Sequence, residues 1–132
     1  MVAKVKVRDL PPGRLLSVKP DTSLAAVARH MRLDDCDSVA VMSGKKLVGI
    51  LTERDLVRAI ADGVDPQQAR ADMFMSADPA TVGADEDLSV VAVKMMTLGI
   101  RHLPVVDAKG APVGLLSARD LVAVLDRGKG QP

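Results

Sequence analysis

The chain has 132 residues and 48% of them are apolar, which is enough to bury the core of one ordinary domain or of two small units. Its 18 lysines and arginines nearly balance its 17 acidic residues, and it contains one phenylalanine and no tryptophan or tyrosine. This composition argues against a general polyanion binder, which needs excess positive charge. It also argues against a platform for single-stranded nucleic acid, which needs aromatic rings for the bases.

A single cysteine, Cys36, excludes an internal disulfide and favours a reducing compartment. No apolar run approaches the roughly 20 residues of a membrane helix, and the first residues lack the apolar stretch of a signal peptide. We therefore expect a soluble, cytoplasmic protein with no membrane partner.

In chain order, the first predicted strand is short and covers residues 15–18. An amphipathic helix follows over 24–32, because apolar residues recur there with the spacing i, i+3, i+4, i+7. Ser23 is its predicted N-cap. Two apolar runs, at 38–42 and 47–51, are separated by a short turn and predict a β-hairpin. A second helix begins directly after the hairpin.

Residues 63–80 contain glycine, proline and mixed charges, and we interpret them as a connector. The same order of elements then begins again, with a predicted strand near 80–82 and an amphipathic helix from Leu88. We place the two copies at 8–62 and 81–127.

The clearest sign of repetition is "LVGILTERDLV" at 47–57, which returns as "PVGLLSARDLV" at 112–122. Between 47–60 and 112–125, seven of the 14 paired residues are identical. Each copy reads strand, helix, strand, strand, helix, which predicts an α/β (α+β) fold. One copy alone buries little surface, so we expect two halves to pack about a pseudo-twofold axis into one module.

Each copy carries a hydroxyl residue and an aspartate three residues later, where the hairpin passes into the closing helix. The pairs are Thr52 with Asp55 and Ser117 with Asp120. This spacing matches a capping box, in which the two side chains satisfy backbone N–H groups at the helix start. A purely structural role therefore explains the motif without any ligand.

Three features favour a ligand instead. Gly49 and Gly114 lie inside predicted strands, where glycine often marks the close approach of another group. The helix start offers N–H groups to an anion. Arg54 and Arg119 add positive charge in the first turn. A carboxylate for a sugar diol beside donors for a phosphate is the chemistry that holds a nucleotide.

These repeated motifs resemble the CBS domain, named after cystathionine β-synthase, in tandem. The stretches "MFMSADPATVGADEDLSVV" (73–91) and "GIRHLPVVDAKGAPVGLLSARDLV" (99–122) carry the resemblance, which extends from about Val7 to Arg127. The resemblance implies a stand-alone CBS pair with two clefts between its halves that bind adenosine-containing ligands. It also implies frequent pairing into homodimers.

The resemblance further implies roles for single residues. Asp55 and Asp120 are expected to hold ribose hydroxyls, and Thr52 and Ser117 to contact the ribose or phosphate. Further site residues are expected just before or within the other strands and in the first helical turns: Ser17, Ser38, Arg54, Thr81, Arg101, His102 and Arg119.

The first copy departs from the basic pattern that the resemblance implies before the second strand. It has Asp37 and Ser38 where the second copy has Arg101 and His102. We therefore expect two clefts of unequal phosphate affinity, one of which can stay empty.

Other kinds of site have less support. The acidic segment 33–37 could suit a hard metal ion, but the second copy has no counterpart, so we expect a solvated loop and no metal. A catalytic constellation needs a nucleophile with a base in one pocket, and a duplicated motif favours binding over catalysis. We therefore expect that the protein is not an enzyme and that it requires no cofactor.

The leading hypothesis is a sensor that binds AMP, ADP or ATP, ahead of NAD and S-adenosylmethionine, and signals to an unknown downstream protein. The alternative is a dimerisation or interaction scaffold without a ligand. A third hypothesis is nucleic-acid binding through Arg101, Lys109 and Arg119.

Overall fold

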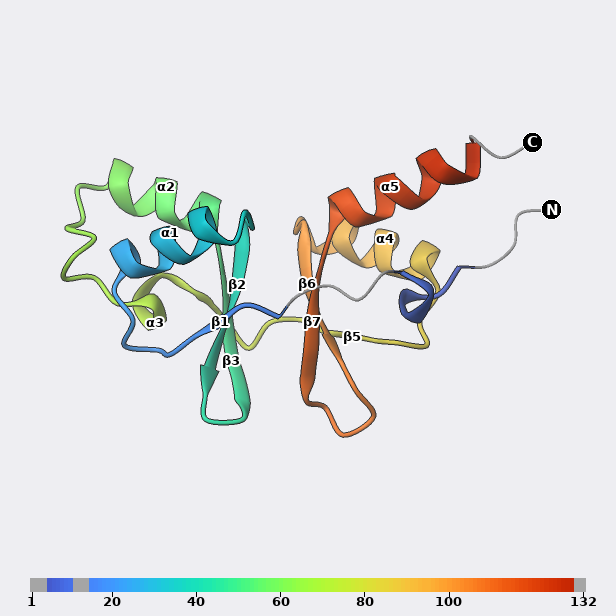
Figure 1. The fold of residues 1–132 in the computed structure, drawn as a ribbon, viewed down its shortest axis with the longest axis horizontal. Helices are drawn as coiled ribbons and strands as arrows, with labels where there is room; N and C mark the ends of the chain where they lie inside the picture. Colours follow the sequence, from blue (N-terminus) through green and yellow to red (C-terminus); the bar gives the residue numbers. More distant parts are fainter. Residues whose placement is uncertain (1–4, 11–14, 130–132) are drawn as a thin grey trace. The chain divides into compact units, whose positions relative to one another are not determined.

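The computed structural model describes residues 5–10 and 15–129 (Figure 1). The chain forms two compact units. The first unit is Leu15–Pro79. The second unit begins at Ala80 and also includes the N-terminal segment, of which residues 5–10 are described.

The first unit contains one four-stranded sheet and three helices. Its elements are β1 (Ser17–Val18), α1 (Leu24–Leu33), β2 (Ser38–Ser43), β3 (Lys46–Thr52), α2 (Glu53–Ala61), α3 (Ala71–Phe74) and β4 (Ser76–Ala77). The strand order is β1-β2-β3-β4, in which β1 and β2 are parallel and the other pairs are antiparallel.

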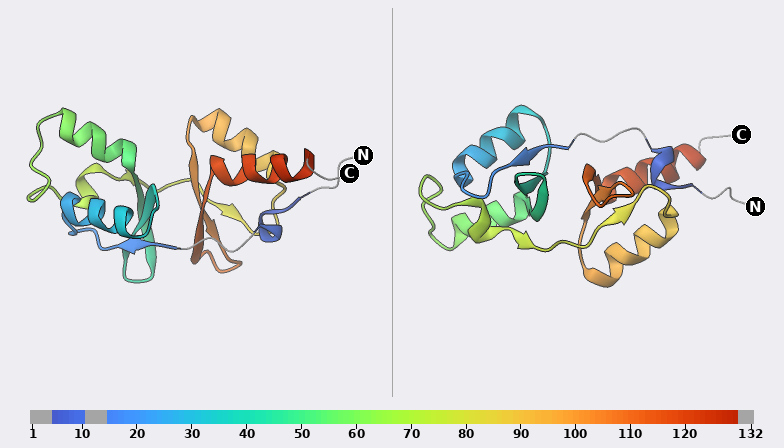
Figure 2. Two further views of the ribbon diagram at one scale, coloured as in Figure 1. Left: turned by 45° about the horizontal axis from the view of Figure 1, so that its top comes forward. Right: turned by 90° about the horizontal axis from the view of Figure 1, so that it is seen from below.

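The core of the first unit lies between its helices and one face of its sheet (Figure 2). The predicted apolar face of α1 is confirmed, because Leu24, Val27 and Met31 are buried. They pack in one cluster with Val39 and Val41, which lie on the same face of β2. The intervening Ala40 is buried as well, so β2 is covered on both faces. The Ser23 N-cap is also confirmed, since its side chain accepts a hydrogen bond from the amide of Ala26 at 3.1 Å.

The second unit contains a three-stranded sheet and the matching helices. Its elements are the 3-10 helix η1 (Val7–Asp9), β5 (Val82–Gly83), α4 (Leu88–Leu98), β6 (His102–Val106), β7 (Pro112–Ser117) and α5 (Ala118–Lys129). The strand order is β5-β6-β7, with β5 parallel to β6 and β6 antiparallel to β7. Leu88, Val91 and Met95 of α4 are buried in its core with Leu103 and Leu116.

The predicted order of strand, helix, strand, strand, helix is thus confirmed in both copies, and the fold is of the mixed α/β class. The connector proposed for 63–80 has structure of its own, because it contains α3 and β4. β4 extends the first sheet at the edge of β3, where Ala77 pairs with Gly49. An otherwise open strand edge is covered in this way. The repeat boundaries 8–62 and 81–127, and the pseudo-twofold packing of the two copies, remain predictions.

The N-terminal segment completes the second unit. The amide of Val7 donates to the carbonyl of Glu86 at 3.0 Å, and that of Arg8 donates to Ala84 at 2.9 Å. The Val7 side chain is only 7% exposed and belongs to the core cluster of the second unit. The loop before α4 is therefore closed by residues that lie more than seventy positions earlier in the sequence.

The same arrangement occurs in the first unit, where residues 69–72 close the loop before α1. The amide of Ala71 donates to the carbonyl of Thr22 at 2.8 Å, and that of Asp72 donates to Pro20 at 3.0 Å. Ala71 is fully buried. The repeat thus extends further than the sequence motifs indicated, since Val7 and Ala71 occupy matching places.

Within residues 5–10 and 15–129, no helix has the length and apolar character needed to cross a membrane.

Candidate functional site at the start of each closing helix

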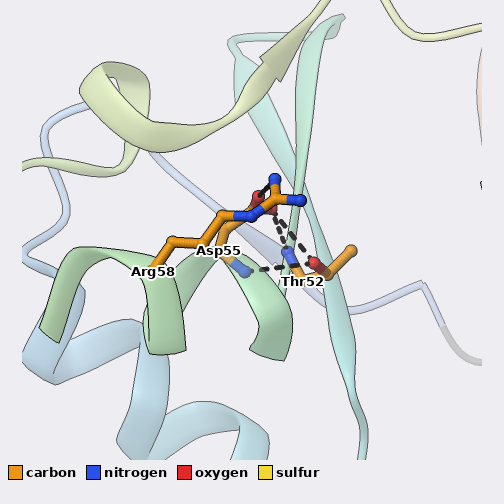
Figure 3. A network of polar contacts seen from close by, with 3 residues as sticks. All are labelled: Thr52, Asp55 and Arg58. Atoms are coloured by element: carbon orange, nitrogen blue, oxygen red, sulfur yellow. Dashed lines mark hydrogen bonds and ion pairs between the residues drawn. The ribbon is translucent and has the colours of Figure 1, made fainter. Parts of the chain in front are cut away.

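The predicted capping box of the first unit forms at the junction of β3 and α2 (Figure 3). Oδ2 of Asp55 accepts hydrogen bonds from the amide of Thr52 at 2.8 Å and from its hydroxyl at 3.1 Å. The Thr52 hydroxyl in turn accepts from the amide of Asp55 at 3.4 Å. The motif therefore performs the structural role that its spacing predicts.

The second unit repeats this geometry at the junction of β7 and α5. Oδ2 of Asp120 accepts from the amide of Ser117 at 2.7 Å and from its hydroxyl at 3.1 Å. The amide of Asp120 donates back to the hydroxyl of Ser117 at 3.3 Å. Both aspartates thus direct one carboxylate oxygen onto their own chain, and any ligand must use the other oxygen.

The neighbouring strand brings the predicted basic pair to the same place in the second unit. His102 pairs directly with Ser117 in the register of β6 and β7. The carbonyl of Arg101 accepts a hydrogen bond from the amide of Ala118, the first residue of α5, at 2.8 Å. The residues predicted from the two ends of the β6–β7 hairpin therefore meet at one helix start.

The first unit has the corresponding geometry with different side chains. Ser38 pairs with Thr52, and the carbonyl of Asp37 accepts from the amide of Glu53 at 3.0 Å. Ser38 is buried and Asp37 is half-buried, whereas Arg101 in the second unit is exposed. The exchange of Asp37 and Ser38 for Arg101 and His102 therefore lies directly beside the two helix starts.

The two residues predicted from the short parallel strands lie one strand further away. Ser17 pairs with Ala40 of β2, two residues beyond Ser38 and therefore on the same face of the sheet. Thr81 directly precedes β5, and its carbonyl accepts a hydrogen bond from Nζ of Lys94 at 3.2 Å. This lysine was absent from the predicted site, because its contact with Thr81 depends on the packing of α4 against β5.

The two carboxylates differ in what surrounds their second oxygen. The Asp55 side chain is 14% exposed, and its Oδ1 lies 3.9 Å from Nη1 of Arg58 (Figure 3). Asp120 is exposed, and among the residues that the structure describes its Oδ1 has no hydrogen-bond or ion-pair partner. Ala123 stands where the first unit has Arg58. The second copy therefore presents the more accessible carboxylate.

The charge around the two helix starts also differs. The first unit places three acids and two arginines there: Asp37, Glu53, Arg54, Asp55 and Arg58. The second unit places one acid and two arginines there: Arg101, Arg119 and Asp120. Local charge is thus negative in the first unit and positive in the second, so an anion is favoured at the second.

Gly49 requires a correction to one argument from the sequence. We expected the strand glycines to mark the close approach of a ligand, but the group that approaches Gly49 is Met75 of the same unit. A Cβ atom on Gly49 would overlap Sδ of Met75 and would lie 2.7 Å from its Cγ and 3.0 Å from the carbonyl oxygen of Ser76. Chain packing therefore explains this glycine.

Gly49→Ala is accordingly expected to lower the free energy of unfolding of the first unit by about 1–3 kcal/mol, the usual cost of overpacking. Met75→Ala should recover at least half of this loss when the two changes are combined, because it removes the overlapping atoms. Denaturant unfolding of the two single variants and the double variant measures this coupling.

Gly83→Ala is the matched control, since a Cβ atom there would meet only Oε2 of Glu86, at 4.0 Å. It should leave stability unchanged or slightly increased, because alanine loses less backbone entropy than glycine. Strictly additive effects of Gly49→Ala and Met75→Ala would show that this contact does not explain the glycine.

Among the described residues, no three histidine, cysteine, aspartate or glutamate side chains come together in a way that could hold a metal ion. This includes the acidic segment 33–37, where Asp35 adopts a left-handed conformation with φ of 51° at the end of α1.

A comparison with protein-family models finds the CBS domain twice in this chain, at residues 7–62 and 70–127. An uncharacterised 17.7 kDa protein of Acidianus ambivalens is 31% identical over 122 residues, which make up 91% of this chain and 73% of that protein. A protein of Methanopyrus kandleri, also uncharacterised, is 32% identical, and this chain spans 61% of its length.

Two solved structures share the fold over most of the chain. A CBS domain protein of Pyrobaculum aerophilum, solved as a complex with AMP, is 28% identical with a TM-score of 0.82, covering 89% of this chain and 90% of that one. A CBS domain pair solved with 5′-methylthioadenosine and S-adenosyl-L-methionine has a TM-score of 0.87 at 23% identity, covering 96% of this chain and 99% of that one. At that identity the second structure supports the fold alone.

Proposed function

The chain belongs to the CBS domain family, and we propose from this that it is a non-catalytic regulatory module that binds an adenine nucleotide. The proposed ligand is AMP, ADP or ATP, and its ribose hydroxyls bind the aspartate at the start of a closing helix. The observation that carries the proposal is the second unit, which brings an accessible carboxylate, two arginines and a helix N-terminus to one place.

Each group supplies a different part of the recognition. A carboxylate oxygen accepts hydrogen bonds from both hydroxyls of a ribose, and the remaining oxygen of Asp120 is suited to this role. Arginine binds phosphate oxygens with charge-assisted hydrogen bonds, which we assign to Arg101 and Arg119. The amides of the first turn favour negative charge in the same region. The proposed site therefore suits a nucleoside with an attached phosphate.

The similar AMP-bound protein supports the same ligand class. We further propose that the bound nucleotide stabilises one arrangement of the protein over another. A ligand shifts such an equilibrium only as far as its affinity differs between the two arrangements. The downstream protein that reads this shift would then recognise the nucleotide-bound arrangement.

Isothermal titration calorimetry with AMP, ADP, ATP, NAD and S-adenosylmethionine tests the proposal. We expect saturable binding of an adenine nucleotide and a higher melting temperature in its presence. If none of the five produces heat or thermal stabilisation at millimolar concentration, the sensor function is wrong.

The scaffold hypothesis has an observation in its favour and remains the second candidate. Both aspartates already serve their own helices, and Met75 already fills the space beside Gly49. Under this hypothesis the motifs maintain the fold and no nucleotide binds. Asp120→Ala and Asp120→Asn separate the two candidates, because only a nucleotide sensor can lose ligand-induced stabilisation in these variants.

We also propose that the protein forms a homodimer in the cytoplasm. Exposed apolar side chains on three helices support self-association, because such side chains are typical of interfaces. They are Val57 and Ile60 of α2, Val90, Val93 and Met96 of α4, and Val122 of α5. Sedimentation that remains monomeric across the soluble concentration range would contradict the dimer.

A further inference from the structure

The outward side of α4 carries no charge. Its exposed residues are Ser89, Val90, Val93, Met96, Thr97 and Leu98. The one charged residue of this helix is Lys94, and its ammonium is bound by the carbonyl of Thr81 at 3.2 Å and lies 3.5 Å from Oε1 of Glu86. The opposite side of α4 packs in the core of the second unit. A helix that is apolar on both sides is typical of one that is covered all round.

The matching helix of the first unit, α1, has a charged outward side instead. Arg29 and Arg32 stand where α4 has Val93 and Met96, since Leu24 and Leu88 begin the two helices. Both arginines are exposed. Val93 and Met96 are 61% and 82% exposed, although neither gains from water. Covering α4 with another protein surface therefore costs less desolvation than covering α1.

The exposed stripe of α4 reads the same in both directions. Val90 and Met96 lie three residues to either side of Val93, and all three are apolar. Ser89 and Thr97 lie four residues to either side, and both carry a hydroxyl. Offsets of three and four residues place all five on one helix face. Such a stripe is complementary to itself when two helices meet antiparallel about a twofold axis.

We propose that the outward side of α4 binds α4 of a second copy of this chain, antiparallel about a twofold axis at Val93. Each Val90 then lies level with the partner's Met96. The same pairing of α1 would bring two Arg29 side chains together, and a pairing of α1 with α4 would cover arginines with apolar side chains. This inference rests on the homodimer of the proposed function and adds the surface and the register through which it forms.

The size of the stripe sets the expected strength of the dimer. Five side chains from each copy are far fewer than the roughly 20–30 residues a side of a standard interface. We therefore expect a dissociation constant of about 1–100 μM.

Sedimentation equilibrium of the full chain tests whether α4 meets itself. Val93→Glu places two carboxylates beside the axis and Val93→Lys places two ammonium groups there. Each variant should raise the dimer dissociation constant at least about tenfold. An equimolar mixture of the two should dimerise about as tightly as the unchanged chain, because opposite charges then meet. A contact of α4 with a different surface would give no such rescue.

Val113→Glu is the matched control, because it makes the same change at a 52% exposed valine of the second unit that lies on β7 and not on α4. It should alter the dissociation constant by less than about twofold. Val93 is exposed, so its variants should keep the fold of the single chain. Circular dichroism and thermal unfolding verify this for each variant.

The antiparallel register is tested with a second set of variants. Val90→Glu and Met96→Lys should each weaken the dimer, and the double variant should restore it. In the double variant each introduced carboxylate lies level with an introduced ammonium group of the partner subunit. The two positions are six residues apart, so they do not pair within one helix. A double variant that dimerises more weakly than either single variant would show that the register is wrong.

Two further outcomes separate this inference from the function it rests on. If Val93→Glu weakens the dimer no more than Val113→Glu does, or if the mixture with Val93→Lys gives no rescue, α4 is not the twofold contact, while the homodimer stands. If the unchanged chain stays monomeric across its soluble concentration range, the proposed homodimer fails and this inference fails with it.

Discussion

Replacing Val7 with aspartate is expected to lower the free energy of unfolding of the second unit by about 3 kcal/mol or more, because it places a charge without a partner in an apolar core. Val7 is 7% exposed and packs in one cluster with Val82, Leu88 and Leu103. Hydrogen exchange should therefore show lost protection in β6 and β7, while the amides of β2 and β3 keep theirs.

Two controls make this expectation specific. Arg8→Ala removes an ion pair to Asp85 whose side chains are 55% and 79% exposed, so stability should change by no more than about 0.5 kcal/mol. Ala71→Asp makes the matching change in the first unit, where the amides of β2 and β3 should lose hydrogen-exchange protection instead. If Val7→Asp lowers the free energy of unfolding no more than Arg8→Ala does, the N-terminal segment is not part of the core of the second unit.

Asp120→Ala is expected to weaken nucleotide binding by about tenfold to a hundredfold, since a hydrogen bond to a charged group contributes about 1.5–3 kcal/mol. The same change should cost the ligand-free protein only about 1 kcal/mol, the usual value of a helix cap. Calorimetry gives the first quantity and denaturant unfolding without ligand gives the second.

Asp120→Asn is the companion variant, because its amide oxygen can still accept from Ser117 while the negative charge is gone. Compared with Asp120→Ala, it should recover most of the lost stability of the ligand-free protein and little of the lost nucleotide affinity. The scaffold hypothesis predicts a different pattern, in which Asp120→Ala lowers apo stability and no variant changes a ligand-induced stabilisation, because there is none.

Local sequence patterns predicted much of the fold. The apolar spacing of Leu24, Val27 and Met31 is a property of a single helix face, and these residues are buried as expected. The hydroxyl and acid of each capping box lie within one helical turn, so their geometry follows from their spacing alone. Short-range regularities of this kind need no knowledge of the rest of the chain.

The role of the segments 5–10 and 69–74 could not be predicted in this way. The two segments occupy matching places in their units, so Val7 corresponds to Ala71 and Arg8 to Asp72. No corresponding residues of the two segments are identical, so the sequence does not reveal the match. Their docking depends on backbone hydrogen bonds, for which the side-chain sequence carries little signal. The composition of residues 63–80 accordingly indicates a connector, although the segment supplies α3 and β4.

Some contacts among the candidate site residues could be predicted from the sequence, whereas the contacts that surround them could not. The pairing of His102 with Ser117 follows from the hairpin, and the position of Arg101 beside α5 follows from that pairing. The contact of Met75 with Gly49 could not be predicted in this way, because it depends on how α3 and β4 pack against β3. Arg58 could have been found, since it lies three residues after Asp55 on the same helix.

The most direct test of the central claim is a crystal structure of the chain grown with AMP. The account predicts that the two ribose hydroxyls lie within hydrogen-bonding distance of the Asp120 carboxylate, with the phosphate facing Arg101 and Arg119. A nucleotide bound away from Asp120, or a structure at saturating AMP with none at the start of α5, would contradict it.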